Sequence, residues 1–186
     1  YIFRDYVDSR IVDADTIQKI KDADSDKERE RLIHRLILEH HGRPFGTAGD
    51  SFMAEFASPV EAVRCAMACQ EALSRINADL PLNRRFLLRI GVNLGDVMLD
   101  GDNLYGTGVN IAARLQTIAD PGGICISQSV YDLVRQRLTL EVEDIGRQPT
   151  KNIAEPVQAY RVVLHDGRSR MARVLRRHGR TIRAFL

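Results

Sequence analysis

The sequence predicts an α+β fold with a ferredoxin-like β-α-β-β-α-β core and additions at its carboxyl end. Segments with the period of a strand alternate with segments that have the 3.6-residue period of a helix. Two strands around a tight turn follow the first helix directly, and the order of the elements matches this plan. A chain of 186 residues is long enough for one domain with a substantial core.

The composition of the chain excludes few functions. A hydrophobic share of 44%, a charged share of 28% and a net charge of +2 are ordinary for a globular domain and indicate no class of partner. Cys65, Cys69 and Cys125 have neither disulfide nor metal-ligand spacing, so we expect buried thiols in a reducing, cytoplasmic setting. No apolar run is as long as a membrane span, and no signal peptide is visible.

The first half of the chain is organised around a hairpin at residues 44–56. Apolar residues alternate on both sides of a tight turn at 48–51, where Gly49 supplies the conformational freedom that such a turn needs. Asp50 would then lie at the tip of a rigid hairpin, where a carboxylate can reach a ligand. Most Gly-Asp turns only reverse the direction of the chain and bind no ligand, so the turn alone does not identify a binding site.

Helices are predicted on both sides of this hairpin. Residues 1–7 are a candidate first strand, and residues 26–41 have the apolar spacing of a helix with Gly42 as its C-cap. After the hairpin, Ser58-Pro59-Val60-Glu61 combines an N-cap residue, a proline in the first turn and a glutamate, which predicts a helix that runs to about Asn77.

The second half begins with a long apolar stretch at residues 86–99. It predicts a central strand that is bent or divided near Gly91 and Gly95, where missing side chains allow a close approach. The remaining predicted elements are a turn at 100–103, a helix at 109–118, a buried strand at 124–126, a small helix at 130–136, and strands at 138–145 and 157–164.

The ends of the chain differ from its middle. Residues 165–186 contain seven arginines and one acid, which favours a solvated or partly helical tail over a patch for anionic lipid or nucleic acid. Aromatic residues are not interleaved there before Phe185, so no nucleic acid is expected as a partner. The chain starts at Tyr1 without a methionine, and we expect regulatory domains outside it.

Candidate chemistry lies on the predicted helix at 109–118. Its Asn110 and Arg114 are four residues apart and share one face, close to the glycine-rich start Gly106-Thr107-Gly108. A helix N-terminus offers free N–H groups and the positive end of a dipole. With an arginine fork and an amide added, this face suits a phosphate or a developing oxyanion.

These residues carry a resemblance to a known family. Residues 104–115 and 121–127 resemble the class III adenylate and guanylate cyclase catalytic domain, with the greatest likeness to its bacterial members. The other similar segments are residues 91–97 (the family's central strand), 47–52 (its metal hairpin) and 151–157 (its late loop). The resemblance implies a nucleotidyl cyclase fold over residues 1–164, with 165–186 as a basic tail.

The resemblance implies two-metal catalysis with two Mg²⁺ (or Mn²⁺) ions per active site. Asp50 is similar to the hairpin aspartate that holds these ions, and Asp5 to the aspartate of the first strand. Asp8 is a competing ligand, because it replaces a glycine of the family pattern and the spacing after Asp5 is slightly long.

The same resemblance assigns the groups that bind substrate. Asn110 is similar to the residue that orients the ribose, Arg114 to the one that stabilises charge at the α-phosphate, and Lys151 to the lysine that pairs with the distal phosphates. In the family these groups come from a partner chain, so the resemblance implies a homodimer with active sites at its interface. Asn103 would join them from the partner chain.

Base selection departs from the family pattern. Adenylate cyclases usually have a lysine where this chain has Gly46 and an aspartate where it has Asn103. The amide of Asn103 can both donate a hydrogen bond to a purine edge and accept one from it. Losing one charged donor costs on the order of 1–3 kcal/mol of recognition free energy. We therefore expect relaxed base selection, with ATP preferred over GTP.

Two functions of different classes follow from these residues. The first is a nucleotidyl cyclase, an adenylate cyclase-like phosphorus–oxygen lyase that forms a 3′,5′-cyclic nucleotide and pyrophosphate, with cAMP ahead of cGMP. The alternative is a degenerate cyclase domain that binds nucleotide or dimerises without turnover, which Asp8, Gly46 and Asn103 favour. A diguanylate cyclase has a similar metal turn but lacks the helix with Asn110 and Arg114.

The hairpin aspartate generates a first prediction. Asp50→Ala should abolish turnover and leave the fold and the dimer largely intact, because the residue is predicted at an exposed turn. Cyclic nucleotide formation, thermal unfolding and the sedimentation of the purified variant measure the three effects. Severe unfolding instead would mean that Asp50 is structural.

Overall fold

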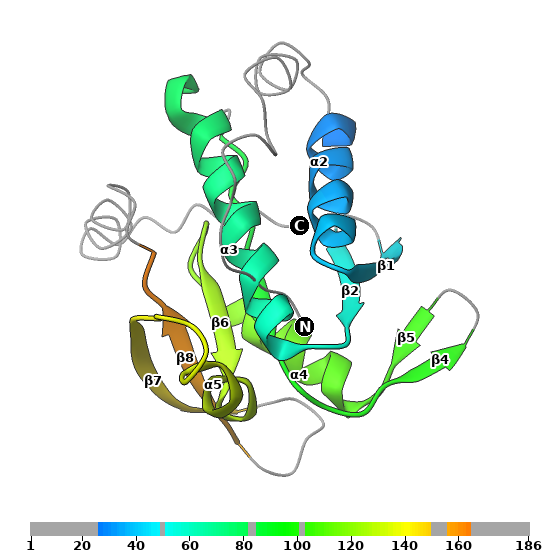
Figure 1. The fold of residues 1–186 in the computed structure, drawn as a ribbon, viewed down its shortest axis with the longest axis vertical. Coiled ribbons are helices and arrows are strands. Elements are labelled where there is room, and N and C mark those ends of the chain that lie inside the picture. The colour runs from blue at the N-terminus through cyan, green and yellow to red at the C-terminus, as the bar shows by residue number, and fades with distance from the viewer. Residues whose placement is uncertain (1–25, 49–50, 82–84, 101–102, 150–155, 165–186) are drawn as a thin grey trace.

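The computed structural model describes residues 26–48, 51–81, 85–100, 103–149 and 156–164 (Figure 1). The predicted first strand and the basic tail lie outside the described residues, and so do four residues of the predicted site. These four are Asp5, Asp8, Asp50 and Lys151.

The described elements alternate between helices and strands along the chain. The helices are α2 (Asp26–Glu39), α3 (Pro59–Ile76), the 3₁₀ turn η1 (Asn77–Asp79), α4 (Thr107–Ile118) and α5 (Gln128–Val134). The strands are β1 (Gly42–Ala48), β2 (Ser51–Phe56), β3 (Ile90–Val92), β4 (Met98–Asp100), β5 (Asn103–Tyr105), β6 (Ile124–Ser127), β7 (Val142–Gln148) and β8 (Val157–Val162).

A four-stranded sheet of order β3-β6-β8-β7 lies at the centre. Strand β3 runs parallel to β6, whereas β8 is antiparallel to both β6 and β7. Two further pairs, β1-β2 and β4-β5, form separate antiparallel ribbons. In the first ribbon Ala48 pairs with Ser51, as the predicted hairpin requires, whereas Gly49 and Asp50 of the predicted turn lie outside the described residues.

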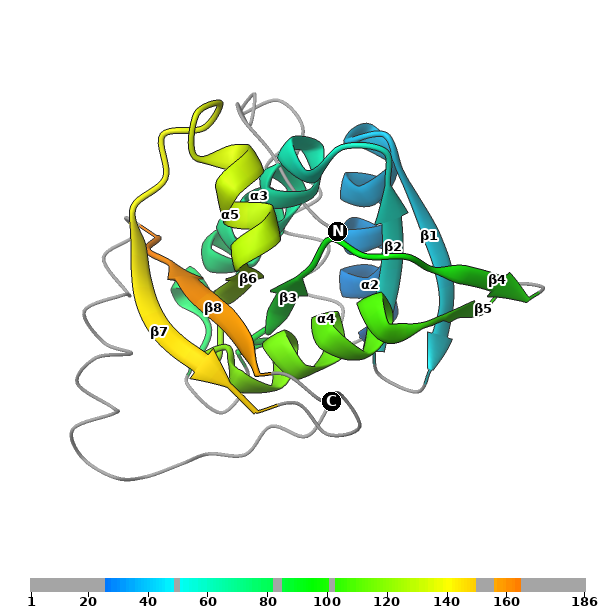
Figure 2. The ribbon, with the colours of Figure 1, turned by 90° about the horizontal axis from the view of Figure 1, so that it is seen from below.

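Helices cover both faces of the central sheet (Figure 2). On one face α3 and α5 pack against buried residues of β3 and β6 such as Val92 and Ile126, and α2 packs against α3 in the same core. On the other face α4 packs Leu115 and Ala119 against Cys125 and Ala159. Because α4 has a whole sheet face to itself, the strands under it determine where its polar side chains lie.

The three cysteines are buried and free, as the sequence predicts. Cys65 and Cys69 lie on the inner face of α3 with their Sγ atoms 3.8 Å apart. Burial raises the pKa of Cys125 to about 11, so this thiol is protonated and unreactive at neutral pH.

The central strand is shorter than predicted from residues 86–99. Only Ile90–Val92 joins the sheet, and Met98–Asp100 pairs instead with β5, a strand that the sequence pattern did not predict. At Gly91 the backbone of α4 touches the strand, since a Cβ there would lie 2.1 Å from the carbonyl oxygen of Ala112. The chain leaves the sheet after this contact to follow the helix, which periodicity alone cannot indicate.

Gly42 is not the C-cap of the first helix. Helix α2 ends at Glu39, and His41 takes the left-handed conformation with φ 58°. Gly42 begins β1, and a Cβ there would lie 1.6 Å from Cε1 of Phe56. The glycine is therefore needed for space beside a buried ring and not to end the helix.

The other boundaries differ by a few residues. Helix α4 begins at Thr107, and β7 begins at Val142 instead of residue 138. Leu138 continues the turn after α5, because its N–H donates to the carbonyl of Val134 at 2.9 Å. Within the described part of the chain, none of the helices combines the length and the apolar character needed to cross a bilayer.

The contact at Gly91 generates a prediction about stability. Gly91→Ala should lower the free energy of unfolding by about 1–3 kcal/mol, because the new Cβ meets backbone atoms that cannot rotate away. Gly146→Ala is the matched control, since its Cβ meets no atom within 4 Å and only its φ of 75° opposes the change. Urea denaturation measures both. A smaller loss for Gly91→Ala than for Gly146→Ala would contradict the close contact.

Candidate active site

The amino-terminal end of α4 is built from glycine. Gly106 precedes the helix with φ 131°, and no side chain caps the helix there. A Cβ on Gly106 or on Gly108 would lie 3.0 Å from the carbonyl oxygen of Asp96. The start of α4 therefore lies directly against the backbone of the segment that leads to β4.

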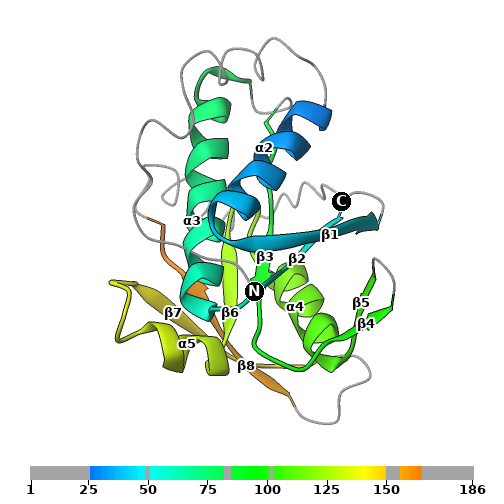
Figure 3. The ribbon, with the colours of Figure 1, turned by 45° about the vertical axis from the view of Figure 1, so that its right-hand side comes forward.

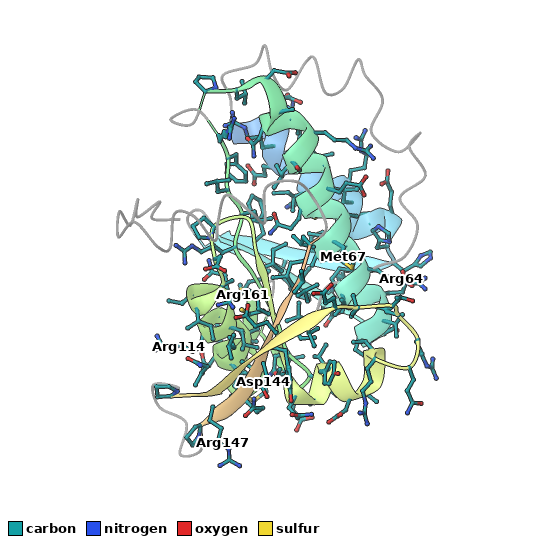
Figure 4. The ribbon with its side chains drawn as sticks, turned by 90° about the vertical axis from the view of Figure 1, so that its left-hand side faces the viewer. Arg64, Met67, Arg114, Asp144, Arg147 and Arg161 are labelled. Carbon is teal, nitrogen blue, oxygen red and sulfur yellow. The ribbon has the colours of Figure 1, made fainter. Side chains whose placement is uncertain are left out.

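Asn110 and Arg114 lie one turn apart on the side of α4 that faces away from the sheet. Asn110 is exposed and Arg114 is half-buried. The Nε–H of Arg114 donates to the carbonyl oxygen of Pro149 at 3.1 Å, and Figure 4 shows Arg114 beside the end of β7. Pro149 is two positions before Lys151 in the sequence. The structure thus brings the predicted arginine together with the segment that leads to the predicted lysine.

The carboxyl-terminal end of α4 is held by two other arginines. The guanidinium of Arg89 donates to the carbonyl of Ala119 at 2.7 Å and to that of Thr117 at 3.3 Å. Arg161 on β8 forms an ion pair with Asp120 at 2.9 Å, just after the helix. Cations at this end also complement the negative end of the helix dipole.

The two predicted base-selecting positions lie on neighbouring ribbons. Gly46 belongs to β1 and Asn103 begins β5, and these two strands are in contact. The β4-β5 ribbon projects from the body of the domain (Figures 1 and 3). Met98 and Tyr105 are the cross-strand pair at the base of this ribbon, and 67% and 51% of their surfaces are exposed.

Metal ligands were predicted at Asp5 and Asp50, outside the described residues. Among the described residues, no cluster of three or more histidine, cysteine or acidic side chains is placed to hold a metal ion. The predicted ligands fit Mg²⁺ by chemistry, since carboxylate oxygens are its preferred protein donors.

Comparison with known proteins assigns the family. Residues 27–163 match the family model described as the adenylate and guanylate cyclase catalytic domain. The chain belongs to this family. The match spans α2 through β8, so it includes the whole of the described fold.

Relatives of known name extend beyond the matched region. A putative adenylate cyclase 3 from Rhizobium meliloti is 43% identical over 131 residues, which are 70% of this chain and 22% of that protein. The serine/threonine-protein kinase pkn2 from Myxococcus xanthus is 29% identical over 132 residues, which are 71% of this chain and 16% of that protein. The chain thus spans no more than 22% of the length of either relative.

Solved structures confirm the fold. An adenylate/guanylate cyclase/hydrolase from Silicibacter pomeroyi aligns over 87% of this chain and 92% of that one, with a TM-score of 0.71 and 33% identity. The adenylyl cyclase CyaB from P. aeruginosa aligns over 86% of this chain and 88% of that one, with a TM-score of 0.60 and 20% identity. The predicted α+β cyclase fold is therefore confirmed, and so is the prediction that the domain is of the cyclase type.

Sequence reasoning missed the residues that hold α4 in place. Arg89 and Pro149 act through backbone carbonyls far away in sequence, which no local pattern indicates. Asn93 stands out in the sequence as a polar residue. It is an amide within an apolar segment, and it is buried with 5% of its surface exposed.

Proposed function

We propose that this chain is the catalytic domain of a nucleotidyl cyclase that converts a nucleoside triphosphate into a 3′,5′-cyclic nucleotide and pyrophosphate. ATP is the preferred substrate and GTP the weaker one. The observation that carries the proposal is the face of α4, where Asn110 and Arg114 stand one turn apart with Arg114 bonded to Pro149. Membership in the cyclase family supports it.

Arg114 supplies positive charge where negative charge develops. Its Nε–H is engaged by the Pro149 carbonyl, so the guanidinium plane is oriented before substrate arrives. The remaining N–H donors of the fork can bond the oxygens of the α-phosphate as the 3′-oxygen attacks and pyrophosphate leaves. Such preorganised donors lower the barrier more than they tighten substrate binding.

Asn110 and Lys151 would act on the two ends of the substrate. The exposed amide of Asn110 can donate to and accept from the ribose, which holds the 3′-hydroxyl in line with the α-phosphorus. Lys151 follows Pro149 closely in the chain, so the bond between Pro149 and Arg114 supports a shared phosphate site. An ammonium group there would pair with the distal phosphates.

Two Mg²⁺ (or Mn²⁺) ions per site would be held by Asp50 and by Asp5, with Asp8 as the alternative. When bound, such ions favour ionisation of the ribose 3′-hydroxyl and offset the charge of the triphosphate. The oxygen donors of these acids match both ions.

A homodimer would complete each active site. One protomer would contribute Asp5 and Asp50, and its partner the face with Asn110 and Arg114. Exposed apolar residues on and before the projecting ribbon support an interface there. These residues are Leu94, Val97, Met98 and Tyr105.

The limits of the domain are also part of the proposal. We assign residues 1–164 to the catalytic domain and 165–186 to a basic tail that binds no nucleic acid. Regulatory domains would flank it, which the greater length of its relatives supports. Because ATP and GTP are cytoplasmic metabolites, the domain would work in the cytoplasm.

The alternative is a degenerate domain that binds nucleotide or dimerises without turnover. Gly46 and Asn103 favour it, because the first has no side chain and the second is an amide where the family pattern has an acid. Loss of base contacts weakens substrate binding without removing the groups that act on phosphate, so the cyclase remains the first proposal.

The proposal is tested by assaying the purified dimer with ATP and with GTP in Mg²⁺ or Mn²⁺. We expect cAMP to form faster than cGMP, with a preference of less than about 100-fold, because Gly46 and Asn103 replace the charged base-selecting residues of the family pattern. Sedimentation establishes the dimer in the same buffer. A confirmed dimer that forms neither product would establish the degenerate alternative.

A second test concerns Arg114. Arg114→Ala should lower kcat by about 10²–10³-fold and change KM only a few-fold, because the group acts mainly in the transition state. Arg135→Ala is the matched control, since this exposed arginine directly follows α5, which lies on the other face of the sheet. A normal kcat with a raised KM would mean that Arg114 only contacts a phosphate of the bound substrate and does not act in the transition state.

A further inference from the structure

At Gly91 and at Gly95, the backbone of helix α4 directly contacts the backbone of β3 and of the segment after it. A Cβ on Gly91 would lie 2.3 Å from the amide nitrogen of Gln116, and one on Gly95 would lie 3.0 Å from Cα of Gly108. No side chain separates the two backbones at these points. A shift of the helix by a few tenths of an ångström would therefore create a clash or a gap.

One side chain bonds across this contact. Asn93, between Gly91 and Gly95, is buried, and its Nδ2 donates to the carbonyl oxygen of Gly108 at 3.1 Å. Gly108 lies in the first turn of α4, whose N-cap is a glycine that offers no side-chain bond. The first turn, which no side chain caps, is thus bonded through one of its carbonyls to the segment directly after β3.

The bond sets the rotation of the helix about its axis. Successive helical residues are about 100° apart, so Asn110 lies about 200° from Gly108, on nearly the opposite side. In agreement, Gly108 is buried against Gly95 and Asp96, which follow β3, and Asn110 is exposed. Holding Gly108 therefore holds the direction in which Asn110 and Arg114 point.

An apolar residue would fill the same space at this position, and Val92 beside it is fully buried. A buried amide costs stability unless its hydrogen bonds are made. The amide at position 93 offers what an apolar side chain cannot, which is a directional bond to one carbonyl. This difference between an amide and an apolar side chain favours a positioning role for Asn93 over a role in packing alone.

We propose that Asn93 is a positioning residue of the cyclase site, which sets the axial rotation of α4 and thereby the placement of Asn110 and Arg114. This inference rests on the proposed function. Asn93 itself does not touch substrate, and it acts through the carbonyl of Gly108. Misplacement of a reacting group by about 1 Å costs about 10²-fold in rate, so loss of this bond should be visible in kcat.

The test uses two variants that each replace a buried amide by a carboxyl group of the same shape. Asn93→Asp removes the donor to Gly108. Gln70→Glu is the matched control, because Gln70 on α3 has 6% of its surface exposed and donates to the carbonyls of Leu88 and Gly123 at 2.9 and 3.0 Å. Neither of these carbonyls belongs to α4.

We expect both variants to lower the melting temperature, but only Asn93→Asp to lower kcat, by about 10- to 100-fold with KM within about 3-fold of wild type. The loss should shrink relative to wild type as the pH falls, because a protonated carboxyl can again donate to Gly108. Equal losses of kcat in both variants, or a normal kcat in Asn93→Asp, would overturn the proposal.

A measurement independent of activity separates this inference from the proposed function. Hydrogen exchange of the amides in the first two turns of α4 should accelerate in Asn93→Asp at neutral pH and stay unchanged in Gln70→Glu. If wild type makes no cyclic nucleotide, the proposed function fails and the exchange rates still decide the positioning role. Unchanged exchange in Asn93→Asp would reject it.

Discussion

The structure depends on a contact between two backbones, that of α4 and that of β3 with the segment after it. At Gly91 the helix backbone occupies the space that any side chain would need, and Gly95 and Gly108 meet in the same way. Close packing of this kind leaves few alternative arrangements, because van der Waals repulsion rises steeply at short range. The helix that carries Asn110 and Arg114 is therefore fixed by steric exclusion along the side that faces β3, and at its carboxyl-terminal end by an ion pair and hydrogen bonds.

Sequence patterns predicted the helices and strands that are determined by interactions between residues close together in the chain. The helix at α3 follows from its N-cap serine, whose Oγ accepts the N–H of Glu61 as expected. The hairpin of β1 and β2 follows from alternation around a glycine turn. The pattern failed at residues 86–99, where apolar character is uniform but only Ile90–Val92 joins the central sheet. The partner of a strand is a long-range property, and a single sequence does not contain it explicitly.

The residues of the candidate site also divide into those that a local pattern predicts and those that depend on long-range contacts. Asn110 and Arg114 were predicted because helical spacing alone puts them on one face. The bonds from Arg114 to Pro149 and from Asn93 to Gly108 cross 35 and 15 positions of the chain, and both use a backbone carbonyl, which every residue has. Side-chain identity therefore could not point to either acceptor. Asp5, Asp50 and Lys151 stay predictions from the family resemblance.

The two-stranded ribbons have a consequence for how substrate choice can change over time. Gly46 and Asn103, the positions proposed to face the purine, lie on ribbons that are not part of the four-stranded sheet. Mutations there leave the glycine contacts beneath α4 untouched. A lineage could therefore exchange one nucleotide for another by drift at these ribbons while its phosphate chemistry is inherited unchanged.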